Sequence, residues 1–179
     1  DVRRATIGYG YGLSVTPLQL AHAYATLAND GRRLPLTILR RSDTPAGEQV
    51  ISASVAKQVR GMLELAVSDE GTGRNARIPM YHVAGKTGTS RKAEGNGYSK
   101  YYNAVFAGMA PASKPRLAMV VVVNEPSAGK YYGGTVAAPV FASVMTGALR
   151  LLDVAPDDIS TDRLLMAAGE NVASQEGDR

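Results

Sequence analysis

The stretch Ala84-Gly85-Lys86-Thr87-Gly88-Thr89-Ser90, near the middle of the chain, combines a cation, hydroxyl groups and a bare backbone. Lys86 supplies the positive charge, Thr87 and Thr89 supply hydroxyls, and Gly88 permits close approach of another molecule. We predict that this stretch is a strand whose edge binds an acyl substrate with an anionic end.

Strand patterns continue on the C-terminal side of this stretch. We predict one strand over 81–89, a second over 103–110 and a third over 116–124. The third contains the continuous apolar run 120–123, which is typical of a strand buried on both faces. Residues 91–102 are polar and rich in glycine and predict a loop. The short connections between the strands predict antiparallel pairing.

Helical patterns occur before and after these strands. Thr16 and Pro17 begin the first helix with a capping box, and a second helix is expected over about 52–66. A third is expected over about 135–152, with Pro139 tolerated only near its first turn. Its apolar face is expected to contain Val140, Phe141, Val144, Met145, Ala148, Leu151 and Leu152. The predicted fold class is therefore α+β, an antiparallel sheet flanked by helices.

The composition predicts one folded domain and excludes several classes of function. The chain has 179 residues, of which 45% are hydrophobic, and its formal net charge is +4. The basic pairs are dispersed, so no nucleic-acid patch is expected. The absence of cysteine excludes thiol catalysis, and two histidines are too few for a metal site, so neither a metal nor a cofactor is expected. No run approaches the ~18 apolar residues of a membrane span.

The triplet Gly85-Lys86-Thr87 raises the alternative of a phosphate-binding loop. That motif requires a glycine where Met80 stands and a helix directly after the threonine, where Gly88 follows instead. The pattern therefore disfavours nucleotide binding.

Lys86-Thr87-Gly88 is also the third motif of the penicillin-recognising serine enzymes. Segments elsewhere in the chain match the same family: 9–12 with 17–20, 85–92, 106–108 with 110–112, and 128–134 with 138–141. Together they resemble the class B penicillin-binding proteins, and among these the septal peptidoglycan D,D-transpeptidases of Gram-negative cell division. The resemblance runs from about Arg3 to Pro156 and implies a fold of the β-lactamase and transpeptidase type.

The resemblance implies an acyl-transfer mechanism. An active-site serine would be acylated by the D-Ala-D-Ala end of a stem peptide, or by a β-lactam, and an amine of a second stem peptide would resolve the acyl-enzyme. Lys86 would lie next to the substrate carboxylate, and Thr87 and Thr89 would hydrogen-bond to it. Gly88 would let the substrate pair along the strand, and the N–H of Thr89 would be one oxyanion-hole donor.

The resemblance also implies an aromatic wall around the cleft. Tyr11, Tyr102, Tyr131 and Tyr132 match the positions of this wall, and Arg91 lies on its rim. The alternative for each tyrosine is ordinary packing in the core or in a loop.

The serine nucleophile is expected outside this chain. The matches to Ser-x-x-Lys at 54–57 and 127–130 are treated as chance, since neither fits the family's motif order. We therefore expect 1–156 to be the C-terminal half of a transpeptidase domain and 157–179 to be a surface tail, with a short helix over 163–168.

The resemblance further implies partners and a location. The partners would be the N-terminal half of the same domain and septal division proteins, including a glycan polymerase, and the domain would lie on the periplasmic face of the inner membrane with its anchor outside this chain. Two alternatives stay open: a serine enzyme that hydrolyses β-lactams, and a catalytically silent module that binds peptidoglycan or senses β-lactams.

Overall fold

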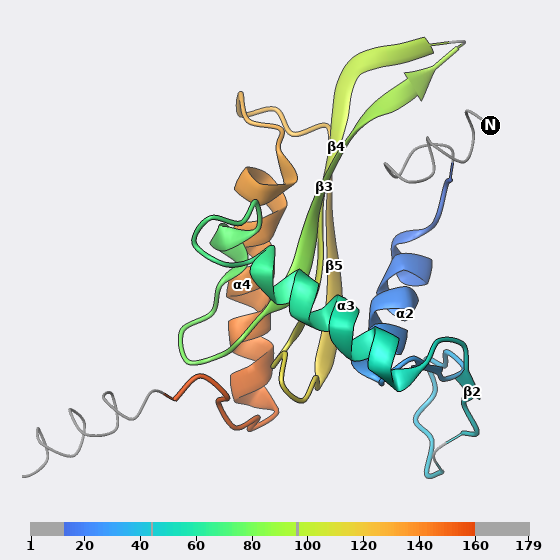
Figure 1. The fold of residues 1–179 in the computed structure, drawn as a ribbon. Coiled ribbons are helices and arrows are strands. Elements are labelled where there is room, and N and C mark those ends of the chain that lie inside the picture. Colours follow the sequence, from blue (N-terminus) through green and yellow to red (C-terminus); the bar gives the residue numbers. More distant parts are fainter. Residues whose placement is uncertain (1–12, 44, 96, 160–179) are drawn as a thin grey trace, which may run out of the picture.

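The computed structural model describes residues 13–43, 45–95 and 97–159. Its main sheet has three antiparallel strands in the order β3-β4-β5, and Figure 1 shows α4 on one side of this sheet and α2 on the other. The elements in chain order are α2 (Pro17–Ala28), β1 (Arg32–Arg33), β2 (Glu48–Gln49), α3 (Ala53–Leu65), η1 (Arg74–Ala76), β3 (Ala84–Glu94), β4 (Gly97–Ala110), β5 (Leu117–Asn124) and α4 (Gly133–Leu151).

The first two long helices begin where the sequence predicts. Gln19 N donates to Thr16 Oγ1 over 3.2 Å and Thr16 N donates to Gln19 Oε1 over 2.8 Å, which completes the capping box of α2. At α3 the hydroxyl of Ser52 accepts from Val55 N over 3.2 Å. Each helix start is therefore determined by side chains within one turn of it.

The strands β3 and β4 differ from the prediction. β3 begins at Ala84 rather than at 81 and continues to Glu94, and β4 already begins at Gly97. The predicted loop over 91–102 is therefore wrong, because most of it forms a hairpin that extends beyond the helices in Figure 1. Aromatic residues favour strands, and the glycines that suggested a loop lie at the turn, where Gly95 has a φ of 55°.

The strand β5 is an outer strand, so the expectation of burial on both faces is wrong. Within the described ranges only β4 pairs with it, and Val122 is 42% exposed. Met119 and Val121 pack on the α4 side of the sheet, whereas Ala118 packs on the α2 side. The apolar run 120–123 therefore belongs to a strand with packed layers on both faces of the sheet. The strand is nevertheless not buried along its whole length.

The helix α4 begins earlier than predicted. Pro139 consequently lies inside the helix rather than in its first turn, at an exposed position where water can satisfy the carbonyl that loses its partner. The buried row is Phe141, Met145 and Leu149, whereas Val140, Val144, Leu151 and Leu152 are exposed, so the predicted apolar face is only partly correct.

By length and composition alone, α4 is also long and apolar enough to cross a membrane. The expectation that no run approaches a membrane span is thus wrong by this measure. The fully buried row of α4 nevertheless packs on the sheet as part of the folded core.

The core beneath α4 fixes the register of the strand that carries the motif. The rings of Phe106 and Phe141 meet edge to face with centroids 4.7 Å apart, and both are fully buried. Phe106 lies opposite Thr87 in the β3–β4 ladder. A Cβ on Gly85 would lie 2.5 Å from Phe106 Cζ, so glycine is required there for packing. Burial of one aromatic side chain thus holds β3 in place.

The segment after α4 is bonded to the base of the sheet. The carboxylate of Asp157 accepts from His82 N over 2.8 Å and from the backbone N and hydroxyl of Ser113 over 3.1 and 2.6 Å. The chain is therefore anchored at least as far as Asp157. The short helix expected over 163–168 lies outside the described residues.

Candidate active site

Lys86 and Thr87 lie on β3, the other outer strand of the sheet, and Lys86 is exposed. Lys86 Nζ donates to the carbonyl oxygen of Thr87 over 3.2 Å and to its hydroxyl over 3.3 Å. A third acceptor, Thr72 Oγ1, lies 3.5 Å away. The cation and the hydroxyls that the sequence singles out are therefore joined at the strand edge.

The participation of Thr72 was not predicted from the sequence. Thr72 Oγ1 lies 3.0 Å from Thr87 Oγ1, so a loop before the strand adds a hydroxyl to the motif. No local pattern marks this contact, because it depends on how the loop folds back against β3.

Thr89 links the strand to the start of α4. Its hydroxyl accepts from Gly133 N over 3.0 Å. The side chain of the N-cap residue Tyr132 makes no capping hydrogen bond, so Thr89 supplies the acceptor from another element. A hydroxyl that accepts one hydrogen bond still has its own hydrogen to donate. The O–H of Thr89 is therefore held in place by the helix and remains available to a ligand.

Gly88 is not required by the packing of the described residues. A Cβ added to it would meet only Val105 Cβ, at the ordinary contact distance of 3.6 Å, and its φ is not left-handed. This contrasts with Gly85, where a Cβ would collide with Phe106. Glycine at position 88 is thus consistent with close approach of a molecule outside the fold.

Three of the four predicted wall tyrosines come together. The rings of Tyr102 and Tyr131 are stacked with centroids 4.2 Å apart, and the rings of Tyr131 and Tyr132 lie 4.5 Å apart. Arg91 Nε donates to the Tyr102 hydroxyl over 3.2 Å, and its guanidinium lies 5.6 Å from the centroid of that ring. The fourth, Tyr11, lies outside the described residues.

The contact between two of these tyrosines changes the acidity of one. The hydrogen bond with Tyr132 and then the nearby charge of its phenolate raise the pKa of Tyr131 above the ordinary value for tyrosine. Tyr131 therefore stays neutral at physiological pH and presents an aromatic surface.

A cavity of about 380 Å³ lies beside these hydroxyls. The loop around Thr72 forms one wall, the start of α4 around Gly134 forms another, and Thr87 and Thr89 contribute from β3. Asn75 Nδ2 donates to Gly134 O over 2.7 Å and ties the two walls together. The lining thus combines threonine hydroxyls and a helix N-terminus with one charged side chain of each sign, Arg74 and Glu70. Lys86 does not line the cavity itself but is bonded to Thr87 and Thr72 at its edge. Hydroxyls and a helix N-terminus suit an anionic group.

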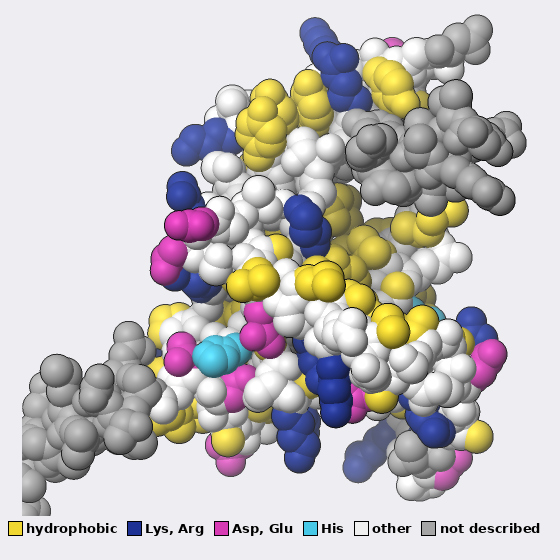
Figure 2. Space-filling view, viewed as in Figure 1, with side chains coloured by type: hydrophobic (Ala, Val, Ile, Leu, Met, Phe, Trp, Pro, Cys, Tyr) yellow, Lys and Arg dark blue, Asp and Glu magenta, His cyan; other side chains and the backbone are white. Residues whose placement is uncertain are grey.

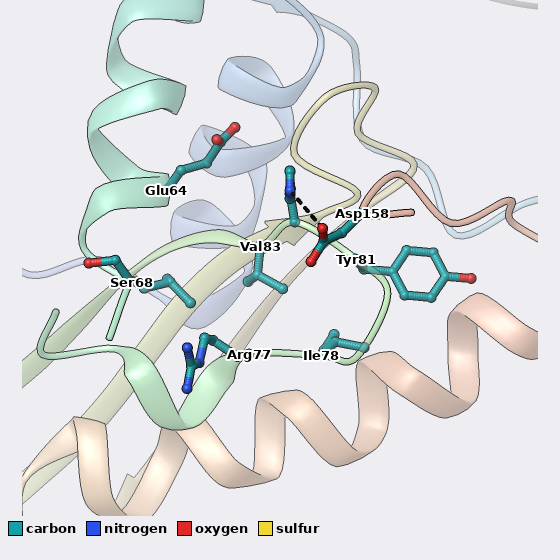
Figure 3. A pocket seen from close by; sticks show the side chains of 9 residues that line it. Glu64, Ser68, Arg77, Ile78, Tyr81, Val83 and Asp158 are labelled. Atoms are coloured by element: carbon teal, nitrogen blue, oxygen red, sulfur yellow. Dashed lines mark ion pairs between the residues drawn. The ribbon is translucent and has the colours of Figure 1, made fainter. Parts of the chain in front are cut away.

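A second hollow, of about 240 Å³, lies near the beginning of β3 (Figure 3). Its floor contains Val83, and the ion pair between His82 and Asp158, 3.5 Å long, crosses its rim. The labelled side chains of Glu64 and Arg77 come from opposite sides of it. Because none of Thr72, Thr87 and Thr89 lines it, this hollow is separate from the cavity beside those hydroxyls.

The charged side chains of the described residues were also compared with the requirements of a metal site. Within residues 13–43, 45–95 and 97–159, no group of three or more histidine, aspartate or glutamate side chains could hold a metal ion. On the face shown in Figure 2, lysine and arginine side chains are scattered among acidic and apolar ones.

An outer strand with Lys-Thr-Gly-Thr beside a helix N-terminus, on an antiparallel sheet covered by helices, defines the class of penicillin-recognising enzymes. Residues 1–146 match the family profile described as the penicillin binding protein transpeptidase domain, and the chain belongs to this family. The predicted family and fold class are confirmed.

Within this family, the chain is similar to proteins named as peptidoglycan D,D-transpeptidases. The chain is 48% identical to the peptidoglycan D,D-transpeptidase FtsI of Escherichia coli K12 over 162 residues, which are 90% of this chain and 28% of that protein. It is 42% identical to the probable peptidoglycan D,D-transpeptidase PbpC of Pseudomonas aeruginosa over 160 residues, 89% of this chain and 28% of that protein. The chain therefore spans less than a third of the length of these relatives.

A solved structure shows the same fold. The apo TP domain of penicillin-binding protein 3 from Burkholderia pseudomallei superimposes with a TM-score of 0.81 and 46% sequence identity, and the match covers 87% of this chain and 48% of that one. About half of that structure thus has no counterpart in the chain.

Proposed function

We propose that this chain is the C-terminal half of a peptidoglycan D,D-transpeptidase domain that cross-links stem peptides during septal cell-wall synthesis and is acylated by β-lactams. The observation that carries the proposal is the convergence of Lys86 Nζ with the hydroxyls of Thr87 and Thr72 at the edge of an outer strand. The named relatives support the reaction type.

The substrate carboxylate binds at this convergence. Lys86 supplies the positive charge, and Thr87 and Thr89 donate hydroxyl hydrogens to the two carboxylate oxygens. Hydrogen bonds to an ionised group are roughly twice as strong as those between neutral groups. The D-alanyl end of a stem peptide and the carboxylate of a β-lactam share this chemistry, so both ligands use the same contacts.

The edge of β3 aligns the scissile bond. Gly88 leaves room for the substrate backbone to lie along the strand, as in β-augmentation. The backbone N–H of Thr89 is one oxyanion-hole donor, and loss of such a contact typically lowers kcat by about 10²–10³. Arg91, Tyr102, Tyr131 and Tyr132, together with Tyr11, line the cleft and contact the side chains of the ligand.

The serine nucleophile comes from residues outside this chain. Two features support completion by another part of the domain: the outer edge of β5 and the exposed apolar row of Val140, Val144 and Leu151 on α4. The match to only 48% of the solved TP domain is consistent with this. The proposed half-domain covers 1–156, and the bonds of Asp157 to His82 and Ser113 extend it by at least one residue.

The complete protein acts at the periplasmic face of the inner membrane. Its substrates there are peptidoglycan stem peptides, and its partners are septal division proteins, including a glycan polymerase. The E. coli relative named as a peptidoglycan D,D-transpeptidase supports the stem peptides as substrates.

The proposal is tested by acylation of the complete protein with a fluorescent penicillin. Lys86→Ala should lower the acylation rate by at least 10²-fold, because it removes the charge that binds the carboxylate. Lys57→Ala, at an exposed position on α3, is the matched control and should leave the rate unchanged. Equal rates for the two variants would contradict the proposal. An acyl-enzyme that persists for hours indicates a transpeptidase, whereas one lost within seconds indicates a β-lactam-hydrolysing enzyme.

A further inference from the structure

The hydroxyl of Thr72 stands between two groups of the carboxylate site. Thr72 Oγ1 lies 3.0 Å from Thr87 Oγ1 and 3.5 Å from Lys86 Nζ, although these residues are 15 and 14 positions away along the chain. Both distances lie within the site whose function is proposed above, and the inference rests on that function.

The loop that carries Thr72 is held at both ends. Gly73 N donates to Ala66 O over 2.8 Å, which ties the loop to the end of α3, and Asn75 Nδ2 ties it to Gly134 O at the start of α4. A Cβ on Gly134 would lie 2.3 Å from Thr72 O, so helix and loop are in direct backbone contact. The position of the Thr72 hydroxyl is therefore determined by the fold rather than by a flexible surface loop.

The hydrogens of the site can be counted. The ammonium of Lys86 can only donate, so both threonine hydroxyls accept from it, and one of them donates to the other. Either hydroxyl can donate in this bond, and when Thr72 donates, the O–H of Thr87 remains free. Thr89 accepts from Gly133 N and keeps its own O–H. Two hydroxyl hydrogens are thus left, one for each oxygen of a carboxylate.

We propose that Thr72 is a positioning residue that orients the Thr87 hydroxyl and the Lys86 ammonium toward the carboxylate of the substrate. Without the Thr72 hydroxyl, the hydroxyl of Thr87 loses the partner that fixes its rotation, and Lys86 loses one of its three acceptors. The effect should therefore depend on whether the ligand carries a carboxylate.

The test compares Thr72→Val and Thr72→Ser in the complete protein. Valine keeps the shape of threonine without the hydroxyl, and serine keeps the hydroxyl. With a penicillin, Thr72→Val should lower the second-order acylation rate about tenfold, which corresponds to ~1.4 kcal/mol or one hydrogen bond to a charged group. With the methyl ester of the same penicillin it should change the rate less than about twofold. Thr72→Ser should restore most of the rate with the free acid.

Thr146→Val is the matched control, since the Thr146 hydroxyl donates only to Ala142 O within α4, and its rates should equal those of the unmodified protein. An equal slowing of acid and ester by Thr72→Val would overturn the inference, because it would show a general structural effect. Unchanged rates for Thr72→Val alongside a slow Lys86→Ala would also overturn it, yet leave the proposed function intact. Unchanged rates for both variants would refute the proposed function itself.

Discussion

Replacing Gly133 by alanine should weaken the contact and the hydrogen bond that hold the start of α4 against β3. A Cβ at this position would lie 2.3 Å from Val105 O and 2.4 Å from Gly88 O. Both are backbone atoms of the sheet, so the start of α4 must move away and the bond from Gly133 N to the Thr89 hydroxyl is lost. Overpacking of this kind costs about 1–3 kcal/mol and the lost hydrogen bond about 1 kcal/mol. The free energy of unfolding should therefore fall by about 2–4 kcal/mol.

Gly147 on the same helix offers a control of opposite sign. Nothing lies within 4 Å of a Cβ at that position, so Gly147→Ala should stabilise the helix by about 0.5–1 kcal/mol. Urea unfolding of both variants in the complete domain measures the difference, and penicillin acylation should be slowed only in Gly133→Ala. A Gly133→Ala variant as stable as Gly147→Ala would refute the argument that the helix start rests directly on the sheet.

Three further changes test other parts of the molecule. Phe106→Ala should lower the free energy of unfolding by about 3–5 kcal/mol in urea titrations, because it empties the centre of the core; a loss below about 1 kcal/mol would contradict the packing described. Tyr132→Phe removes the hydrogen bond that raises the pKa of Tyr131, so the midpoint of the ultraviolet titration of Tyr131 should move to lower pH. An unchanged or higher titration midpoint would exclude that hydrogen bond as the cause. Asp157→Ala leaves the N–H groups of His82 and Ser113 without their acceptor and should destabilise the fold by about 1–3 kcal/mol in urea, whereas no change would show that water replaces the carboxylate.

The features that the sequence predicted correctly depend on neighbouring residues. The capping box of Thr16 and Gln19 lies within one turn, and the charge and hydroxyls at 86–89 lie within one strand. Such patterns are encoded locally, so helix starts and the motif strand follow from them.

The features that the sequence did not predict depend on distant contacts. Thr89 meets Gly133 across 44 positions, and Thr72 meets Thr87 across 15. The hairpin over 91–102 was hidden by its glycines, because composition cannot tell a turn between two strands from a loop. Pro139 was placed too near the helix start because the cap of α4 comes from Thr89 on another element rather than from its own chain neighbours.

The bond between the Thr89 hydroxyl and the amide of Gly133 has one more consequence. When that hydroxyl donates its hydrogen to an anion, its oxygen becomes a stronger acceptor, so ligand binding tightens the first turn of α4. By thermodynamic reciprocity, a firmer helix start favours the bound state. Exchange of the amide hydrogen of Gly133 with deuterium should therefore slow when an anionic ligand is bound at the edge of β3. The exchange rate of this one hydrogen would then measure how much of the protein has ligand bound.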